Sequence, residues 1–169
     1  MEHLGRAASI PLRVYFVGGT SAVVIGWRTA TIDVDLTIRP DDDSLMRAIP
    51  GMKEALDINV ELASPADFIP LPPGWEDRSP LIERRHHAAF HHFDFYSQAL
   101  SKVERGHRQD VDDVQAMIER GLVDSRKARR YFDHIEPELY RFPAIDPPTF
   151  RRAVETAFVD ASPHGSTSA

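Results

Sequence analysis

Two aspartates, Asp33 and Asp35, stand inside the apolar run ATIDVDLTI and are the first residues in the sequence that could do chemistry. The run is β-branched and alternating, as expected of a strand. Residues two apart in a strand face the same side of a sheet, so both carboxylates should point to one side, while Ile32, Val34 and Leu36 should point into the other layer. Because burial of an unpaired carboxylate is costly, the pair predicts either a basic partner or a metal ion.

A second group of polar residues occurs in DINVELA, residues 57–63. As a strand, this segment would place Asp57, Asn59 and Glu61 on one face. If it neighbours the aspartate strand, two or three carboxylates converge on one polar patch. Mg²⁺ and Mn²⁺ favour such oxygen ligands, and two such ions can clamp the attacking and leaving oxygens during transfer at phosphorus.

The turn Gly18-Gly19-Thr20 lies between the apolar run RVYFV and a short helical segment. At such a strand-to-helix turn, backbone N–H groups favour a phosphate, and glycine lets the phosphate approach closely. Thr20 or Ser21 could cap the helix or add a hydroxyl. A glycine pair after a strand is most often a simple turn, but its spacing to Asp33 favours the phosphate-binding interpretation.

The remaining pattern predicts an α/β or α+β fold: a small mixed β-sheet of three or four strands with flanking helices, then a helical half. The expected strands are residues 13–19, 30–38, 57–63 and 86–95. The expected helices are residues 20–27, 43–56 with a kink or break at Pro50-Gly51, 96–106 with Asp94 or Ser97 as cap, 108–121, 125–142 and 149–159. This gives a core over 1–93, a helical segment packed on it over 94–160, and a flexible tail over 161–169.

Composition narrows the classes of function. The 20 basic and 26 acidic residues give a formal charge of −6, which argues against a general nucleic-acid coating protein but allows a local basic groove. Cysteine is absent, which excludes disulfides, zinc–thiolate sites and a thiol nucleophile. The sequence shows neither a secretory signal nor an apolar run of membrane-spanning length, so we expect a cytoplasmic protein without a membrane partner.

Two further motifs, the paired histidines and a basic segment, could each have either a functional or a purely structural role. Paired histidines could bind zinc, but exposed polar residues around Phe90 and Phe93 are the favoured interpretation, because no acidic or thiol partner is obviously placed to complete a site. These histidines are His86, His87, His91 and His92. The basic segment SRKARRYF is usually a solvated helix face, although it could hold an RNA backbone. Its basic residues are Arg126, Lys127, Arg129 and Arg130.

The segment GGTSAVVIGWRTATIDVDL resembles the signature of the nucleotidyltransferase superfamily that includes kanamycin nucleotidyltransferase and DNA polymerase β. In that superfamily a glycine pair opens a helix and an Asp-x-Asp pair follows on the next strand. The segment ALSKVERGHRQDVDDVQAMI is similar to the lysine and aspartate helix of minimal bacterial nucleotidyltransferases and toxins of the abortive-infection type. It supplies Lys102, with Asp110 and Asp113 as candidate acids.

The resemblance implies roles for these residues. Asp33 and Asp35, together with Glu61, would hold Mg²⁺ or Mn²⁺. Glu61 would also be the third carboxylate, which activates the attacking hydroxyl; Asp57 is the rival. The phosphates of the nucleotide would be held by Gly18, Gly19 and Thr20, and Lys102, also a catalytic candidate, and Arg28 would approach them as positive charges. Asp110 is a further candidate for nucleotide binding. Asp113 has a plain structural interpretation, because aspartate near a helix N-terminus stabilises the helix dipole.

The implied activity is metal-dependent transfer of a nucleoside monophosphate from a nucleoside triphosphate to a hydroxyl. The toxin relatives suggest the 3′ end of a tRNA as acceptor and a cognate antitoxin protein as partner. Two alternatives stay open at this point. One is a catalytically inactive nucleotide-binding sensor, and the other is a protein-interaction subunit whose aspartates pair with Arg28 or Lys102.

Overall fold

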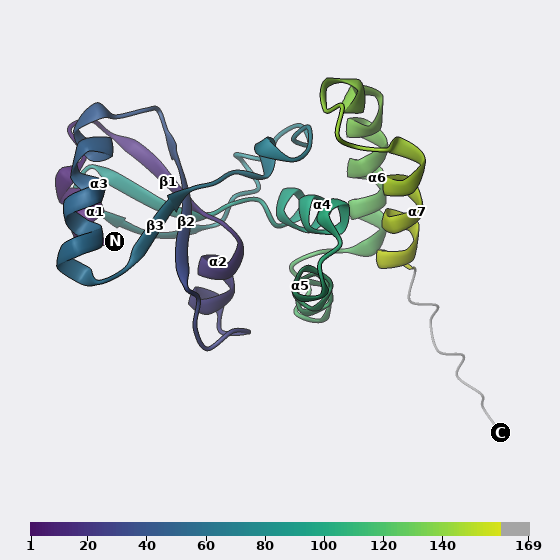
Figure 1. Ribbon diagram of the computed structural model, residues 1–169, viewed down its shortest axis with the longest axis horizontal. Coiled ribbons are helices and arrows are strands. Elements are labelled where there is room, and N and C mark those ends of the chain that lie inside the picture. Colours follow the sequence, from purple (N-terminus) through teal and green to yellow (C-terminus); the bar gives the residue numbers. More distant parts are fainter. Residues whose placement is uncertain (160–169) are drawn as a thin grey trace.

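A computed structural model describes residues 1–159 of the chain, and these residues contain one five-stranded mixed sheet in the order β3-β2-β1-β5-β4 (Figure 1). β1 pairs antiparallel with β2 and parallel with β5. β3 runs parallel to β2, and β4 antiparallel to β5. The strands are β1 (Leu12–Phe16), β2 (Asp33–Arg39), β3 (Asn59–Leu62), β4 (Leu81–Arg85) and β5 (Ala88–His92). The expected mixed α/β fold is confirmed, with β4 as a strand that the sequence pattern had not indicated.

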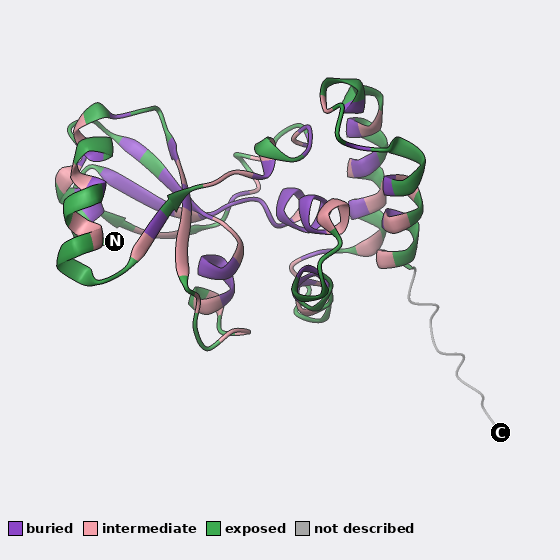
Figure 2. Ribbon diagram, in the orientation of Figure 1, coloured by how far each residue is buried: buried purple, intermediate pink, exposed green. Residues whose placement is uncertain are grey.

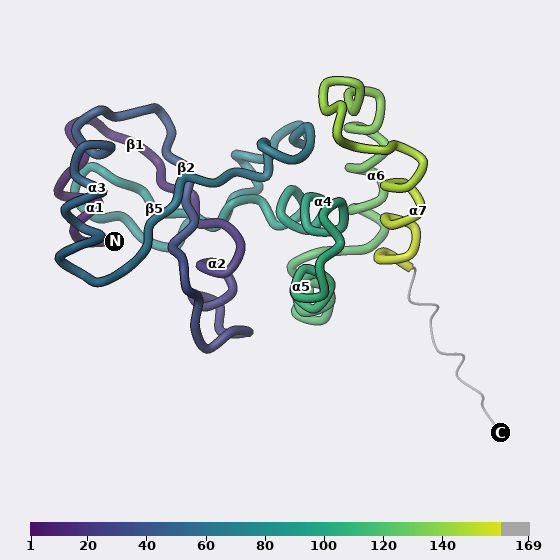
Figure 3. Tube along the Cα trace, in the orientation of Figure 1, coloured from purple at the N-terminus to yellow at the C-terminus, as the bar shows by residue number. Residues whose placement is uncertain are grey.

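One face of this sheet is covered by two helices, α1 (Glu2–Ala7) and α3 (Asp43–Leu56), which lie side by side although they are far apart in sequence (Figure 3). The alternating residues Val14, Leu36 and Phe90 point into the apolar cluster between this face and the helices. The period of two places the polar residues of β2 on the opposite face. The structure therefore has one sealed sheet face and one face left to carry polar chemistry.

The second half is helical and has its own apolar cluster, built around Leu100, Met117 and Phe132 (Figure 2). Its helices are α4 (Phe95–Arg105), α5 (Arg108–Glu119), α6 (Ser125–Ile135) and α7 (Pro147–Ala157); short 3₁₀ turns are η1 (Pro65–Asp67) and η2 (Glu136–Arg141). Asp94 caps α4, as one of the two expected caps. The domain boundary after residue 93 stays a prediction, and the tail over 161–169 lies outside the described residues. No helix within residues 1–159 is long and apolar enough to cross a membrane.

Two local expectations differ from the structure. α3 is not broken at Pro50, because Leu45 and Ile49 anchor its buried face and the Asp42 side chain caps its N-terminus; a kink there stays a prediction. Packing thus outweighs the cost of a proline inside the helix. Ile32, expected to face the apolar layer, is 91% exposed, because β2 begins only at the next residue.

Gly5 provides a test of how α1 packs on the sheet. A Cβ at this position would lie 2.4 Å from the backbone oxygen of Arg85 on β4, so Gly5→Ala must displace backbone. We expect it to lower the free energy of unfolding by about 1–3 kcal/mol in urea denaturation. Gly51→Ala in α3 is the control, since its Cβ would meet open space and should leave stability equal or raise it by up to about 1 kcal/mol. Equal stabilities of the two variants would contradict the close packing of α1.

Candidate active site

The carboxylates lie on the sheet face opposite α1 and α3, where β2 and β3 run side by side. The register pairs Asp33 with Asn59 and Asp35 with Glu61. The Asn59 side-chain amide donates to Asp33 Oδ1 at 2.6 Å and to Glu61 Oε1 at 2.8 Å, so one amide orients two acids. The expected adjacency of these two strands is confirmed.

Asp57 is not part of this carboxylate group. It forms the C-terminal cap of α3 with a left-handed φ of 50°, and β3 begins only at Asn59. The predicted strand over 57–63 was therefore too long at its start. Aspartate tolerates the left-handed conformation, so the first residue of this strand-like pattern can serve as the C-terminal cap of the preceding helix.

The glycine turn directly abuts the carboxylates. Gly18 has a φ of +55° and opens α2 (Gly18–Ile25); a Cβ on it would lie 3.3 Å from Asp35 Oδ2. A Cβ on Gly19 would lie 2.4 Å from Thr31 Oγ1, so side chains are disfavoured at both positions. The Gly18 N–H is not free, because it donates to Gln98 Oε1 at 2.8 Å. The Thr20 N–H is also bonded, to the Val17 carbonyl at 3.2 Å, so an anion here would be attracted mainly by the positive end of the helix dipole.

Thr20 and Ser21 do not cap α2. The N-cap position is Val17, which provides no side-chain bond. The Thr20 hydroxyl accepts from the Asp35 N–H at 3.0 Å, and the Ser21 hydroxyl donates to the Phe16 carbonyl at 2.9 Å. Both hydroxyls therefore fasten α2 to the sheet, and the phosphate contact predicted for Thr20 stays a prediction.

These elements enclose a cavity of about 460 Å³ between the sheet and α4. Among the residues to which the resemblance gave a role, it brings together all except Thr20, Asp57 and Asp113. The candidates that line it are Gly18, Gly19, Arg28, Asp33, Asp35, Glu61, Lys102 and Asp110.

The wall opposite the carboxylates is basic. Lys102 is only 4% exposed, and its amine donates to Asp110 at 2.9 Å and to Asp113 at 2.7 Å. Arg105 donates to Asp110 at 2.7 Å. Arg28, from the loop before β2, forms a two-pronged pair with Asp113. Three cations thus face two carboxylates, which leaves an excess of positive charge beside the cavity.

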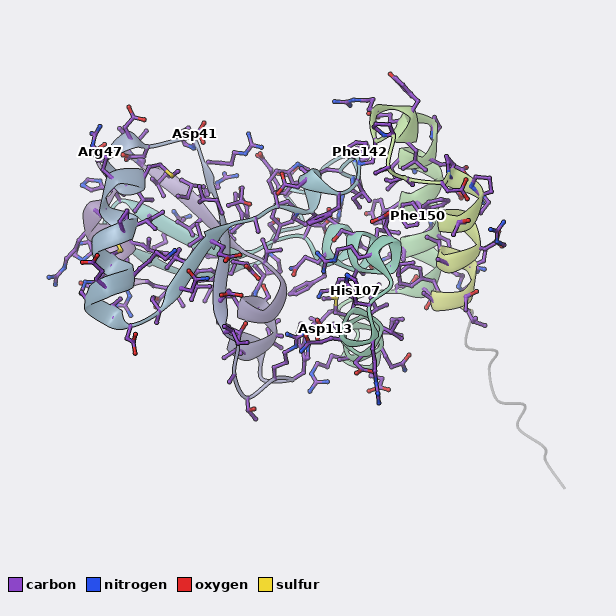
Figure 4. All side chains as sticks on the ribbon, viewed as in Figure 1. Asp41, Arg47, His107, Asp113, Phe142 and Phe150 are labelled. Carbon is purple, nitrogen blue, oxygen red and sulfur yellow. The ribbon has the colours of Figure 1, made fainter. Side chains whose placement is uncertain are left out.

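Asp113 joins the two halves of the protein. It lies on the side of α5 toward α2 (Figure 4) and is 2% exposed. Besides Arg28 and Lys102, it accepts a hydrogen bond from Trp27 Nε1 at 3.0 Å. Its surroundings are therefore those of a buried ion-pair centre rather than of an aspartate that only stabilises a helix dipole.

The two groups of acids differ in their pKa. Burial raises the pKa of Asp35, and the neighbouring charges of Asp33 and Glu61 raise it further, against the opposing effect of Lys102. Burial would also raise the pKa of Asp110, but hydrogen bonds from Arg105 and Lys102 outweigh it and keep that pKa below its usual range. The Asp110 carboxylate is thus already paired, whereas the Asp35 carboxylate is poised for an added cation.

The donor set on β2 fits a magnesium ion. Mg²⁺ is usually bound by one or two carboxylates together with water and substrate phosphates, so it does not need a complete protein cage. Asp33 and Asp35 offer two carboxylates on one strand face beside an anion-favouring helix start. Within residues 1–159, no group of three His, Cys, Asp or Glu side chains is arranged to hold a metal ion, so binding of a metal by Asp33, Asp35 and Glu61 stays a prediction.

The histidines make other contacts. His86 bonds Glu2, and His91 bonds the Ser79 carbonyl. His92 is 8% exposed rather than an exposed polar residue, and it contacts the Ser21 hydroxyl at 3.0 Å. Burial, and to a lesser extent the charge of His91, lower its pKa to about 4, so it packs as a neutral ring.

Sequence reasoning missed Gln98 and Arg105, which both line the cavity. A signal was present, because Gln98, Lys102 and Arg105 follow a spacing of four and three residues and therefore share one face of α4. Gln98 also donates to the Phe93 carbonyl at 2.7 Å. The Gln98 side chain therefore links the glycine turn to the end of β5 and to α4. The hydrogen bonds from Asn59 to Asp33 and Glu61 could not be predicted from the sequence, because they depend on the register of β2 and β3.

The crowded carboxylates lead to a prediction on stability. Because folding raises the pKa of Asp35, its ionised form destabilises the ligand-free protein at any pH above that pKa, and this effect vanishes below the ordinary carboxyl pKa of about 4. Asp35→Asn should therefore raise the Tm by a few degrees at pH 7.5 and by much less at pH 4. Thermal unfolding of the variant beside wild type and the exposed control Asp41→Asn measures this. A lower Tm for Asp35→Asn at pH 7.5 would contradict it.

A glycine turn at a helix start, followed by paired carboxylates on the next strand, is the arrangement that resembled the nucleotidyltransferase superfamily in the sequence. A family described as nucleotidyltransferases of unknown function (DUF6036) matches residues 6–141, and the chain belongs to this family. No curated protein and no solved structure gives a significant match.

Proposed function

We propose that the protein transfers a nucleoside monophosphate from a nucleoside triphosphate to a hydroxyl acceptor, with Mg²⁺ or Mn²⁺ as cofactor. The observation that carries the proposal is the composition of one cavity. Carboxylates from β2 and β3 stand at one side of it, the glycine turn lies beside them, and the cations of α4 stand opposite. A triphosphate needs all three, because its charge must be neutralised and its reacting phosphorus held in place.

In this proposal Asp33 and Asp35 hold the metal, which supplies positive charge to the reacting phosphate oxygens when it is bound. Lys102 and Arg105 attract the negative charge of the triphosphate from the opposite wall. The N-terminus of α2 adds the partial positive charge of its amides. Gln98 keeps the glycine turn in position for this contact.

The proposed reaction forms a bond between the acceptor oxygen and the α-phosphorus. The bond from that phosphorus to the oxygen bridging to the β-phosphate breaks, and pyrophosphate leaves. The proton of the acceptor hydroxyl passes to Glu61, which is exposed and pairs with Asp35 across the β2–β3 ladder. Its exposure leaves room for an acceptor to approach.

The acceptor and partner are proposals that rest on the resemblance to toxin nucleotidyltransferases. They are an RNA hydroxyl, such as the 3′ end of a tRNA, and a cognate antitoxin protein. The direct experiment incubates the protein with each α-labelled nucleoside triphosphate, Mg²⁺ or Mn²⁺, and total cellular RNA. We expect label on one RNA size class with wild type and none with the Asp33→Ala, Asp35→Ala variant. Metal-dependent nucleotide binding without label transfer would support the inactive sensor instead.

The proposed base can be tested against its rival. Glu61→Gln removes the proton acceptor and should lower kcat by at least about 100-fold. Asp57→Asn should leave kcat unchanged, because Asp57 caps α3 outside the cavity and asparagine also accepts the left-handed conformation. Steady-state label transfer measures both variants. A loss with Asp57→Asn and none with Glu61→Gln would reverse the assignment.

A further inference from the structure

A second cavity, of about 520 Å³, lies at the other end of the sheet face that carries the carboxylates. The floor of this cavity is a single row of neighbouring residues, one from each of four adjacent strands. Arg39 on β2 pairs with Arg13 on β1, Arg13 with Ala89 on β5, and Ala89 with Arg84 on β4. The row thus presents three arginines around one small side chain, and all four residues line the cavity.

This row shares its sheet face with the carboxylates. Asp33, Asp35, Thr37 and Arg39 alternate along β2 and therefore point to the same side. At about 3.3 Å per residue, Arg39 lies roughly 13 Å along the strand from Asp35. Figure 4 labels Asp41 just beyond this basic end of β2, away from α2. One sheet face therefore has an acidic end and a basic end.

The positive charge of the row is largely uncompensated. Arg39 and Arg84 are exposed and make no ion pair or side-chain hydrogen bond within residues 1–159. Arg13 approaches Glu76 only to 3.8 Å, and Glu76 is the one acidic side chain among the described residues lining the cavity. Like charges directly opposite each other on neighbouring strands are destabilising, so the fold gains nothing from this arrangement.

Tyr15 gives a second, independent indication of a ligand. It lines the cavity and is fully buried, yet its hydroxyl has no hydrogen-bond partner in the described part of the chain. Its ring packs on Trp75 and Phe93, and a phenylalanine would make those contacts equally well. A buried unsatisfied hydroxyl costs about 1–3 kcal/mol. The hydroxyl lies close enough to the Arg13 guanidinium to raise the pKa of Arg13, and an anion held by Arg13 in the cavity would accept the hydrogen bond of the hydroxyl.

We propose that the row of Arg39, Arg13 and Arg84 binds a backbone phosphate of a nucleic-acid acceptor whose reacting hydroxyl lies at the carboxylates. This inference rests on the proposed function and adds to it the surface that binds the acceptor. The guanidinium group suits phosphate because its planar fork donates two parallel hydrogen bonds. The basic residues of α6 are less well placed, because α6 lies in the helical half, away from the sheet (Figure 1).

The test uses RNA binding without nucleotide. Arg39→Gln, Arg84→Gln is compared with Lys127→Gln, Arg130→Gln, which removes the same charge from α6. Fluorescence anisotropy of a labelled 12-nucleotide single-stranded RNA is followed over a salt series. We expect the sheet variant to bind about 10-fold more weakly or worse, with a salt slope smaller by about 1.4 for two lost phosphate contacts, and the α6 variant to bind normally. In label transfer, the KM for RNA should rise while the KM for the triphosphate stays unchanged.

Tyr15→Phe should weaken RNA binding without lowering the free energy of unfolding of the free protein, a result that a purely structural hydroxyl would not give. Unchanged RNA affinity in the sheet variant, or an equal loss in the α6 variant, would overturn the proposal. Displacement of RNA by 1 mM inorganic phosphate would also overturn it, in favour of a free-anion site. RNA binding is also measured with the same arginine substitutions in the Asp33→Asn, Asp35→Asn variant, which needs no transfer activity. The binding result therefore tests the arginine row even if the protein transfers no nucleotide.

Discussion

Replacing Asp33 and Asp35 together by asparagine should lower nucleotidyl transfer by at least about 10³-fold while the protein stays folded. Both carboxylates lie on one strand face beside the glycine turn, and asparagine keeps their size but removes the charge that holds a divalent cation. Label transfer, with circular dichroism as the check on folding, measures the effect.

The matched control for this pair is Asp41→Asn, Asp43→Asn, which removes the same charge from exposed positions outside the cavity. Its turnover should equal that of wild type. If the Asp33→Asn, Asp35→Asn variant retained more than a tenth of wild-type turnover, the carboxylates would not be the metal ligands of the reaction.

Asp113→Ala should lower the free energy of unfolding by about 3–5 kcal/mol, the largest effect on stability that we expect. The substitution removes the acidic partner of Arg28 and leaves Lys102 with Asp110 as its remaining partner. It also removes the acceptor of the Trp27 indole. Since these contacts join the loop before β2 to α4 and α5, the loss should reach the cavity as well.

Urea denaturation measures this prediction, with the exposed neighbour Asp112→Ala as control, which should change stability by less than about 0.5 kcal/mol. A loss below 1 kcal/mol for Asp113→Ala would show that the ion-pair network does not join the two halves. A double variant with Arg28→Ala should lose less than the sum of both single variants, because the two residues share one interaction.

The elements that carry the site were predictable because their patterns are local. The spacing from Gly18-Gly19 to Asp33 and Asp35 indicated a strand, a turn, a helix and a second strand, all of which the structure contains. The helical pattern from residue 96 onward was equally clear. By contrast, β4 reads LIERR and is mostly charged, and α1 is only six residues long, so neither has an apolar period to detect.

The inner arrangement of the site was less predictable, because it depends on contacts between distant segments. Gln98 meets Gly18 across 80 residues, and Arg28 meets Asp113 across 85. The roles of Asp57 and Glu61 were ambiguous because a strand pattern does not reveal a residue in the left-handed conformation. The row of arginines likewise emerges only from the register of four strands.

The central claim is transfer at the α-phosphorus, and a comparison of two labels tests it most directly. Wild-type protein is incubated with RNA, Mg²⁺ and the same nucleoside triphosphate labelled at either the α- or the γ-phosphate. The proposal predicts that α-label becomes attached to the RNA while γ-label is released in pyrophosphate. Attachment of γ-label to the acceptor would show phosphoryl transfer instead, and attachment of neither label with any of the four triphosphates would contradict the proposed activity.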